Sequence, residues 1–132
     1  MSAAQVAAIV ARLASGPAGT LHAHDATPAN PTYPYVVVYA DGGVKSSDRE
    51  ADVRIRKTLT WQTTVVGTSA TQCRAALDRV TAALEDYRLT VTGYTASKVE
   101  HESSQPVRSD ESLPDRTVFI ATDQWSSVFD PT

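Results

Sequence analysis

Apolar residues near the start of the chain recur with the spacing of an amphipathic helix. They fall at positions i, i+3, i+4 and i+7 and so form one stripe, made by Val6, Ile9, Val10 and Leu13. The pair Gly16-Pro17 follows directly and is typical of a helix end. We therefore expect a short first helix that packs on a sheet.

Two segments after this helix have strand patterns. Residues Tyr35 to Ala40 are β-branched and aromatic, which predicts a strand buried on both faces or nearly so. From Arg54 to Val66 the chain alternates, which predicts a long strand with one core face and one face toward water or a partner. The core face carries Ile55, Leu59, Trp61, Thr63 and Val65; the other carries Arg54, Arg56, Thr58, Thr60, Gln62 and Thr64.

The segments before and between these strands are predicted to be loops. Residues 17–34 hold four prolines and two histidines without periodicity, which is typical of a loop. The sequence Asp41-Gly42-Gly43 signals a turn, and the polar stretch up to Asp52 extends it. The two strands should therefore form a hairpin with a long, solvated tip.

A second helix is predicted from Ser69 to Asp86. Ser69 followed by Gln72 has the form of a capping box, in which each side chain reaches the other residue's backbone. A core-facing stripe at helical spacing follows, made by Cys73, Ala76, Leu77, Val80, Leu84 and Tyr87. This face should cover the sheet.

The last third of the chain is predicted to hold about three strands. Residues Leu89–Tyr94 and Ala96–Glu102 are short strand candidates, Gln105–Asp115 is a polar loop with two prolines, and Arg116–Trp125 is a strand. The tail Val128-Phe129 either packs or awaits a partner. We expect one α+β domain over residues 1–132, with a mainly antiparallel sheet of four to five strands, two helices on one face, and long hairpin loops.

Composition and charge exclude several classes of protein. The net charge of −3 gives no long-range attraction to nucleic acid or to an anionic membrane. No apolar run is long enough to span a bilayer, and the single Cys73 rules out an intrachain disulfide, so we expect a soluble chain in a cytoplasm. The apolar content is mostly Ala and Val, with two Phe, one Met and two Trp, so burial against neighbouring subunits would help the core.

Candidate chemistry is sparse. His22, His24 and Asp25 have metal-ligand types, but a third strong ligand is missing nearby and a polar loop is the favoured interpretation. His101 stands between two glutamates, which could raise its pKa, but a solvated acidic loop is the favoured interpretation. Cys73 is favoured as an inert thiol in the core. Sequence motifs for phosphate, dinucleotide, zinc or nucleophile sites are absent. We expect no enzyme, no cofactor and no metal.

A basic concentration on and before the long strand is the main polar feature. It could contact phosphate, but a charged strand face that meets a neighbouring copy is favoured. The predicted subunit or tube interface, which adds two aromatic residues near the C-terminus, is Lys45, Arg49, Arg54, Arg56, Trp125 and Phe129. The acidic stretch from Glu100 to Asp115 supplies an opposite charge.

The order of these pieces resembles the tail terminator and tail completion proteins of long-tailed bacteriophages. The resemblance covers Val6 to Phe129. It rests on the first helix, the proline-led strand Pro34–Tyr39, the long strand ending Leu59–Thr63, the turn Gly67–Ser69 into the second helix, and a final strand with Val118, Phe119 and Ile120.

This resemblance implies a virion protein that forms a ring, usually hexameric, on the end of the tail tube. Such a ring stops tube polymerisation and joins the head connector or head-completion protein, and genomic DNA passes through it without sequence-specific binding. Assembly would occur in the bacterial cytoplasm. Acids on the first hairpin are the predicted lumen or axial-face residues, since they would repel phosphate: Asp41, Asp48, Glu50 and Asp52.

Two alternatives remain open at this point. One is a neck or head-completion protein of the same virion, which has a similar plan and different neighbours. The other, of a different class, is a small enzyme or metal-binding domain that uses His22, His24 and Asp25.

Overall fold

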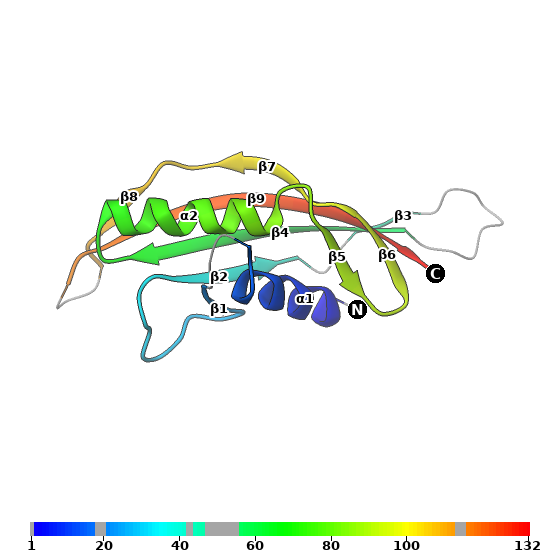
Figure 1. Cartoon of the computed structure of the whole chain (residues 1–132), viewed down its shortest axis with the longest axis horizontal. Helices are drawn as coiled ribbons and strands as arrows, with labels where there is room; N and C mark the ends of the chain where they lie inside the picture. The colour runs from blue at the N-terminus through cyan, green and yellow to red at the C-terminus, as the bar shows by residue number, and fades with distance from the viewer. Residues whose placement is uncertain (1, 18–20, 42–43, 47–55, 113–115) are drawn as a thin grey trace.

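A computed structural model of the chain describes residues 2–17, 21–41, 44–46, 56–112 and 116–132. Within these residues two helices and nine strands follow one another in an α+β arrangement (Figure 1). In chain order they are α1 (Ser2–Ala14), β1 (His22–His24), β2 (Tyr35–Ala40), β3 (Val44–Ser46), β4 (Arg56–Gly67), α2 (Ala70–Leu84), β5 (Arg88–Val91), β6 (Tyr94–Lys98), β7 (Glu100–Ser104), β8 (Arg108–Asp110) and β9 (Val118–Pro131).

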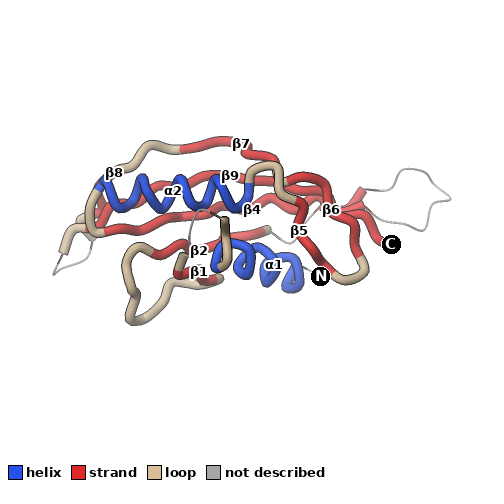
Figure 2. The backbone as a smooth tube through the Cα atoms, in the orientation of Figure 1, coloured by secondary structure: helices blue, strands red, loops and turns tan. Residues whose placement is uncertain are grey.

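The long strands β4 and β9 form the antiparallel centre of the sheet. They pair from Lys57 opposite Phe129 to Gly67 opposite Phe119. Beyond β4 lie β2, β1 and β3, and beyond β9 lie β6, β5, β7 and β8 (Figure 2). Only β1 and β2 pair in parallel among the described strands, so the sheet is mainly antiparallel, as predicted.

The predicted number of four to five strands was too low. Short strands β1 and β8 lie in segments that we predicted to be loops, and β3 lies in the predicted hairpin tip. Each is only three residues long and pairs with part of a longer strand. Three residues are too few to show an alternating pattern, so tertiary pairing decides their conformation.

The segment after α2 divides into three strands where we predicted two. Gly93 has φ +87°, a left-handed conformation that glycine adopts readily, and it turns β5 into β6. At Val99 the backbone leaves the sheet ladder, because its N–H donates to the Tyr87 carbonyl and its carbonyl accepts from Asp86 N–H. Those bonds to the segment between α2 and β5 separate β6 from β7.

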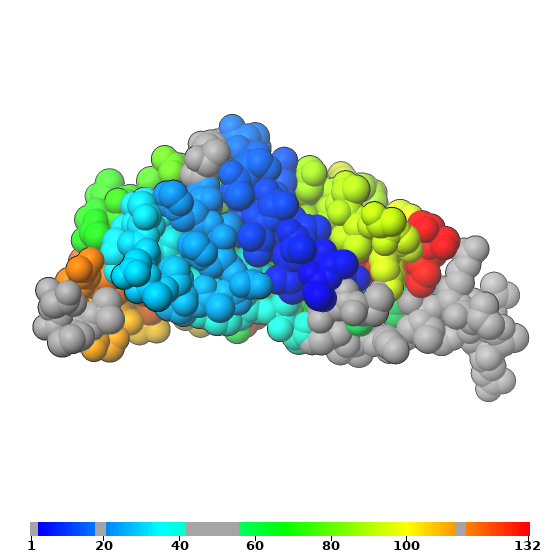
Figure 3. Space-filling model, turned by 90° about the horizontal axis from the view of Figure 1, so that it is seen from below, coloured from blue at the N-terminus to red at the C-terminus, as the bar shows by residue number. Residues whose placement is uncertain are grey.

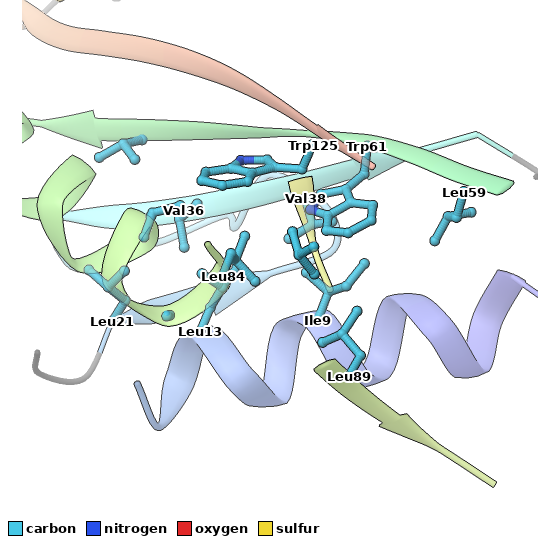
Figure 4. Packing of buried hydrophobic residues seen from close by; sticks show 14 of the residues in the cluster. Ile9, Leu13, Leu21, Val36, Val38, Leu59, Trp61, Leu84, Leu89 and Trp125 are labelled. Atoms are coloured by element: carbon cyan, nitrogen blue, oxygen red, sulfur yellow. The ribbon is translucent and has the colours of Figure 1, made fainter. Parts of the chain in front are cut away.

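Both helices contribute to one core with the inner face of the sheet. Trp61 and Trp125 are direct cross-strand partners on β4 and β9, and both are almost fully buried (Figure 4). Ile9 and Leu13 from α1 and Leu84 from α2 pack against this face at 0% exposure. Each such side chain contributes about 1.5–3 kcal/mol by burial, so the predicted stripes of both helices supply much of the core energy.

The start of α2 follows the predicted cap with one difference. Ser69 Oγ accepts a hydrogen bond from Gln72 N–H at 3.1 Å, as expected for an N-cap. Gln72 Oε1, however, accepts from the N–H of Thr68 at 2.6 Å, one residue earlier than a capping box requires. A Cβ at Gly67 would lie only 3.1 Å from the backbone nitrogen of Cys73, so glycine lets the helix fold back closely on β4.

Candidate assembly surfaces

The predicted metal ligands lie at one edge of the sheet. His22 and His24 belong to β1, which pairs in parallel with β2, and the ring of His24 meets Tyr35 edge-on at 6.1 Å. The loop prediction was therefore wrong for these residues. The described part of the chain contains no group of three His, Cys, Asp or Glu side chains that could hold a metal ion.

Of the predicted basic interface, the structure describes one side chain. Arg56 is exposed at the start of β4, where its Nε donates to Asp130 Oδ1 of β9 at 2.8 Å. Lys45 lies on β3, with only its backbone among the described residues, and Arg49 and Arg54 lie outside them. The structure thus places Arg56 at the surface, in an ion pair within its own chain.

Of the predicted lumen acids, the structure describes Asp41. Its side chain is exposed beside β4, and its backbone N–H donates to the Thr60 carbonyl at 3.1 Å. Its Oδ1 accepts from Thr60 N–H at 3.3 Å. Asp48, Glu50 and Asp52 lie outside the described residues.

Trp125 and Phe129 must be removed from the predicted interface. Both are 0% exposed, because β9 continues to Pro131 and places them on the inner face of the sheet. Phe129 meets the Tyr94 ring edge-on at 6.4 Å, and the indole N–H of Trp125 donates to the hydroxyl of Thr63 at 2.9 Å. Contacts with the core of their own chain account for the burial of both residues.

The outer face of β4 and β9 is not covered by a helix and is rich in hydroxyl and amide groups. Between the Arg56–Asp130 ion pair and the apolar end of the face, its cross-strand pairs are uncharged, and the Thr64 and Thr122 hydroxyls lie 3.1 Å apart. The polar members are Thr58, Thr60, Gln62, Thr64, Thr122, Gln124 and Ser126. The polar side chains of this face disfavour its burial in a core. Along this stretch the face also carries no cation that could bind phosphate.

His101 has a different environment from the solvated loop that we predicted. It lies on β7 and stacks on Trp125 with ring centroids 4.4 Å apart. Its Nε2 lies 3.5 Å from a carboxylate oxygen of buried Asp123, and its Nδ1 lies 3.9 Å from one of Glu85. These acids come from β9 and from the C-cap of α2, so sequence neighbours gave no signal of them. The cluster joins β7 to the core and the end of α2.

The described residues provide no positive evidence of catalysis. The Cys73 thiol is buried against β4, where its Sγ is 3.8 Å from the Val65 carbonyl oxygen. Burial raises the pKa of this thiol, which opposes formation of a nucleophilic thiolate, and a nearby arginine only partly offsets that effect. Within the described segments no helix is long and apolar enough to cross a membrane.

Comparisons with known proteins give a family match and a fold match. A family model described as tail completion protein gp17 matches residues 7–120. A solved chain from the virion of a native gene transfer agent particle shares the fold, with a TM-score of 0.73 at 19% identity over 97% of this chain and 96% of that one. A second solved chain, 18% identical over 100% and 96% of the two lengths, has a TM-score of only 0.49. No curated protein matches the sequence.

Proposed function

The chain belongs to the tail completion protein gp17 family, and we propose that it forms a ring that caps the tail tube of a phage-like particle. In this proposal the ring ends polymerisation of the tube protein and offers its other face to the head connector. The family match over residues 7–120 is the observation that carries the proposal.

The architecture supports a role in assembly. Short strands at both sides of the sheet leave backbone edges that can pair or pack with another copy, and a closed ring removes such edges from solvent. The central cross-strand pairs of the outer sheet face are uncharged, the acids Asp41 and Glu102 bond to its Thr60 and Ser126, and the chain is acidic overall. A ring of such subunits would let DNA pass without holding its phosphates.

We retain the hairpin as the proposed contact with a neighbouring subunit or the tube. Its basic members would be Lys45, Arg49, Arg54 and Arg56, and its acids Asp41, Asp48, Glu50 and Asp52 would face the lumen or the ring axis. Arg56 allows a direct test because its partner Asp130 provides a matched control. Arg56→Ala should reduce joined particles, whereas Asp130→Ala breaks the same ion pair but keeps the arginine side chain. Equal losses from both variants would assign the ion pair to the fold of one chain.

Deletion of the gene tests the function itself. We expect filled heads beside overlong, unjoined tail tubes under the electron microscope, and wild-type complementation should restore normal particles. Normal-length tails beside leaking heads would instead indicate the head-completion role. If deletion leaves particles joined and infectious, the proposed function is wrong.

A further inference from the structure

Helix α1 presents alanine to the outside of the molecule. Its exposed positions within the described side chains are Ala3, Ala4, Ala7, Ala11 and Ala14, which we call the alanine face. Arg12 is the only charged residue of α1, and Gln5 is fully buried. A surface helix of a monomeric protein normally carries charged and polar residues outward, so this composition is typical of a helix with a partner on both sides.

A groove beside the alanine face holds a preorganised arginine. The groove has a volume of about 220 Å³ between α1 and β5, with Ala8, Ala11, Arg12, Tyr87 and Leu89 in its wall. The Nε of Arg12 donates to the Ala83 carbonyl at 2.7 Å, and its guanidinium lies over the Tyr87 ring, 3.7 Å from the centroid.

These two contacts fix the plane of the guanidinium and leave its terminal nitrogens without a hydrogen bond or ion pair to a described residue. A guanidinium held in this way is suited to bind a carboxylate through two parallel N–H groups. The groove therefore favours an acidic partner segment beside an apolar surface.

Strand β7 provides such a segment on the opposite side of the molecule. All five of its residues, Glu100–Ser104, are exposed, and it pairs only with β9, so its other backbone edge is unpaired among the described strands. It carries Glu100 and Glu102. In Figure 1 β7 lies along the upper edge and α1 along the lower one, and the view from below in Figure 3 shows α1 at the surface.

We propose that the alanine face and the Arg12 groove of one copy receive strand β7 of the next copy in the ring. This inference rests on the ring proposed above. A cyclic ring needs two different surfaces that are complementary and point in opposite directions, and these two meet that requirement. Alanine side chains let the strand approach closely, while Arg12 meets Glu100 or Glu102. Opposite charges then set the register of the contact.

A charge swap tests the contact. The readout is sedimentation of the purified chain alone and mixed with purified tail tubes, which detects the ring whether it forms in solution or only on the tube. Arg12→Glu, or Glu100→Arg combined with Glu102→Arg, should each weaken assembly about tenfold or more. All three substitutions together should restore a large part of it, since the charges are then exchanged.

A second variant avoids the internal contacts of Arg12. Ala7→Glu lies on the alanine face and should fold normally, because glutamate is a good helix former at an exposed position, yet it should block assembly. Ala82→Glu, at an exposed position of α2, is the control and should assemble like wild type. Normal assembly of folded Ala7→Glu, or no recovery in the swapped chain, would overturn this contact while the ring proposal stands. Absence of wild-type assembly in both conditions would refute the ring and the contact together.

Discussion

Replacement of Phe129 by alanine distinguishes a core role from an interface role at the end of β9. The side chain is 0% exposed and meets Tyr94 edge-on, so the truncation removes a complete aromatic ring from the core. Such a change costs about 3–5 kcal/mol in all, of which loss of the aromatic pair accounts for about 0.5–1.5 kcal/mol. We expect a loss of ~4 kcal/mol, a large share of the roughly 5–15 kcal/mol that stabilises a typical domain.

The assay is urea unfolding of the dilute, monomeric chain followed by far-UV circular dichroism. With a slope of about 2 kcal/mol per molar urea, the midpoint should fall by about 2 M. Val128→Ala is the matched control, because Val128 is the preceding residue on the half-buried outer face and should cost below about 1 kcal/mol. A Phe129→Ala chain as stable as wild type that fails only in assembly would refute the core assignment and restore the interface prediction.

Three further predictions concern local sites. Ser69→Ala removes the N-cap of α2 and should lower the free energy of unfolding by about 1 kcal/mol in thermal denaturation, whereas Thr71→Ala in the same helical turn should cost nothing; equal losses would count against the cap. Cys73 should react with a thiol reagent at pH 8 only after unfolding in urea, because burial raises its pKa; rapid labelling of the folded chain would contradict the structure. The backbone N–H of Ser112 holds the pKa of the Asp110 carboxyl below its ordinary value, so this hydrogen bond stabilises the fold at neutral pH and its contribution is lost as pH falls through the folded pKa. An NMR titration should show the lowered pKa of Asp110. Ser112→Ala should raise that pKa only in part, because the backbone N–H remains.

Several elements could be predicted because their signal is local. The stripe of α1, the cap at Ser69 and the alternation along β4 each depend on neighbours within a few residues, and each was found where expected. Short strands β1, β3 and β8 could not be predicted, since their conformation comes from pairing with another strand, 8 to 14 positions away, and not from a pattern within their own three residues. The same holds for the roles of Trp125 and Phe129. Phe129 looked available for a partner because the predicted last strand ended at Trp125, whereas β9 continues to Pro131.

The candidate surfaces also depend partly on the local sequence and partly on the tertiary structure. Hydrophobic periodicity determined the two helices and the central strand, because side-chain period follows directly from backbone geometry. Only the tertiary structure decided which faces remain outside, since that depends on how the sheet and both helices share one core. It placed the alanine face of α1 and acidic β7 on opposite sides and gave Arg12 its two fixing contacts. Local sequence specifies which face of an element is apolar, whereas packing between distant segments determines whether that face is already covered.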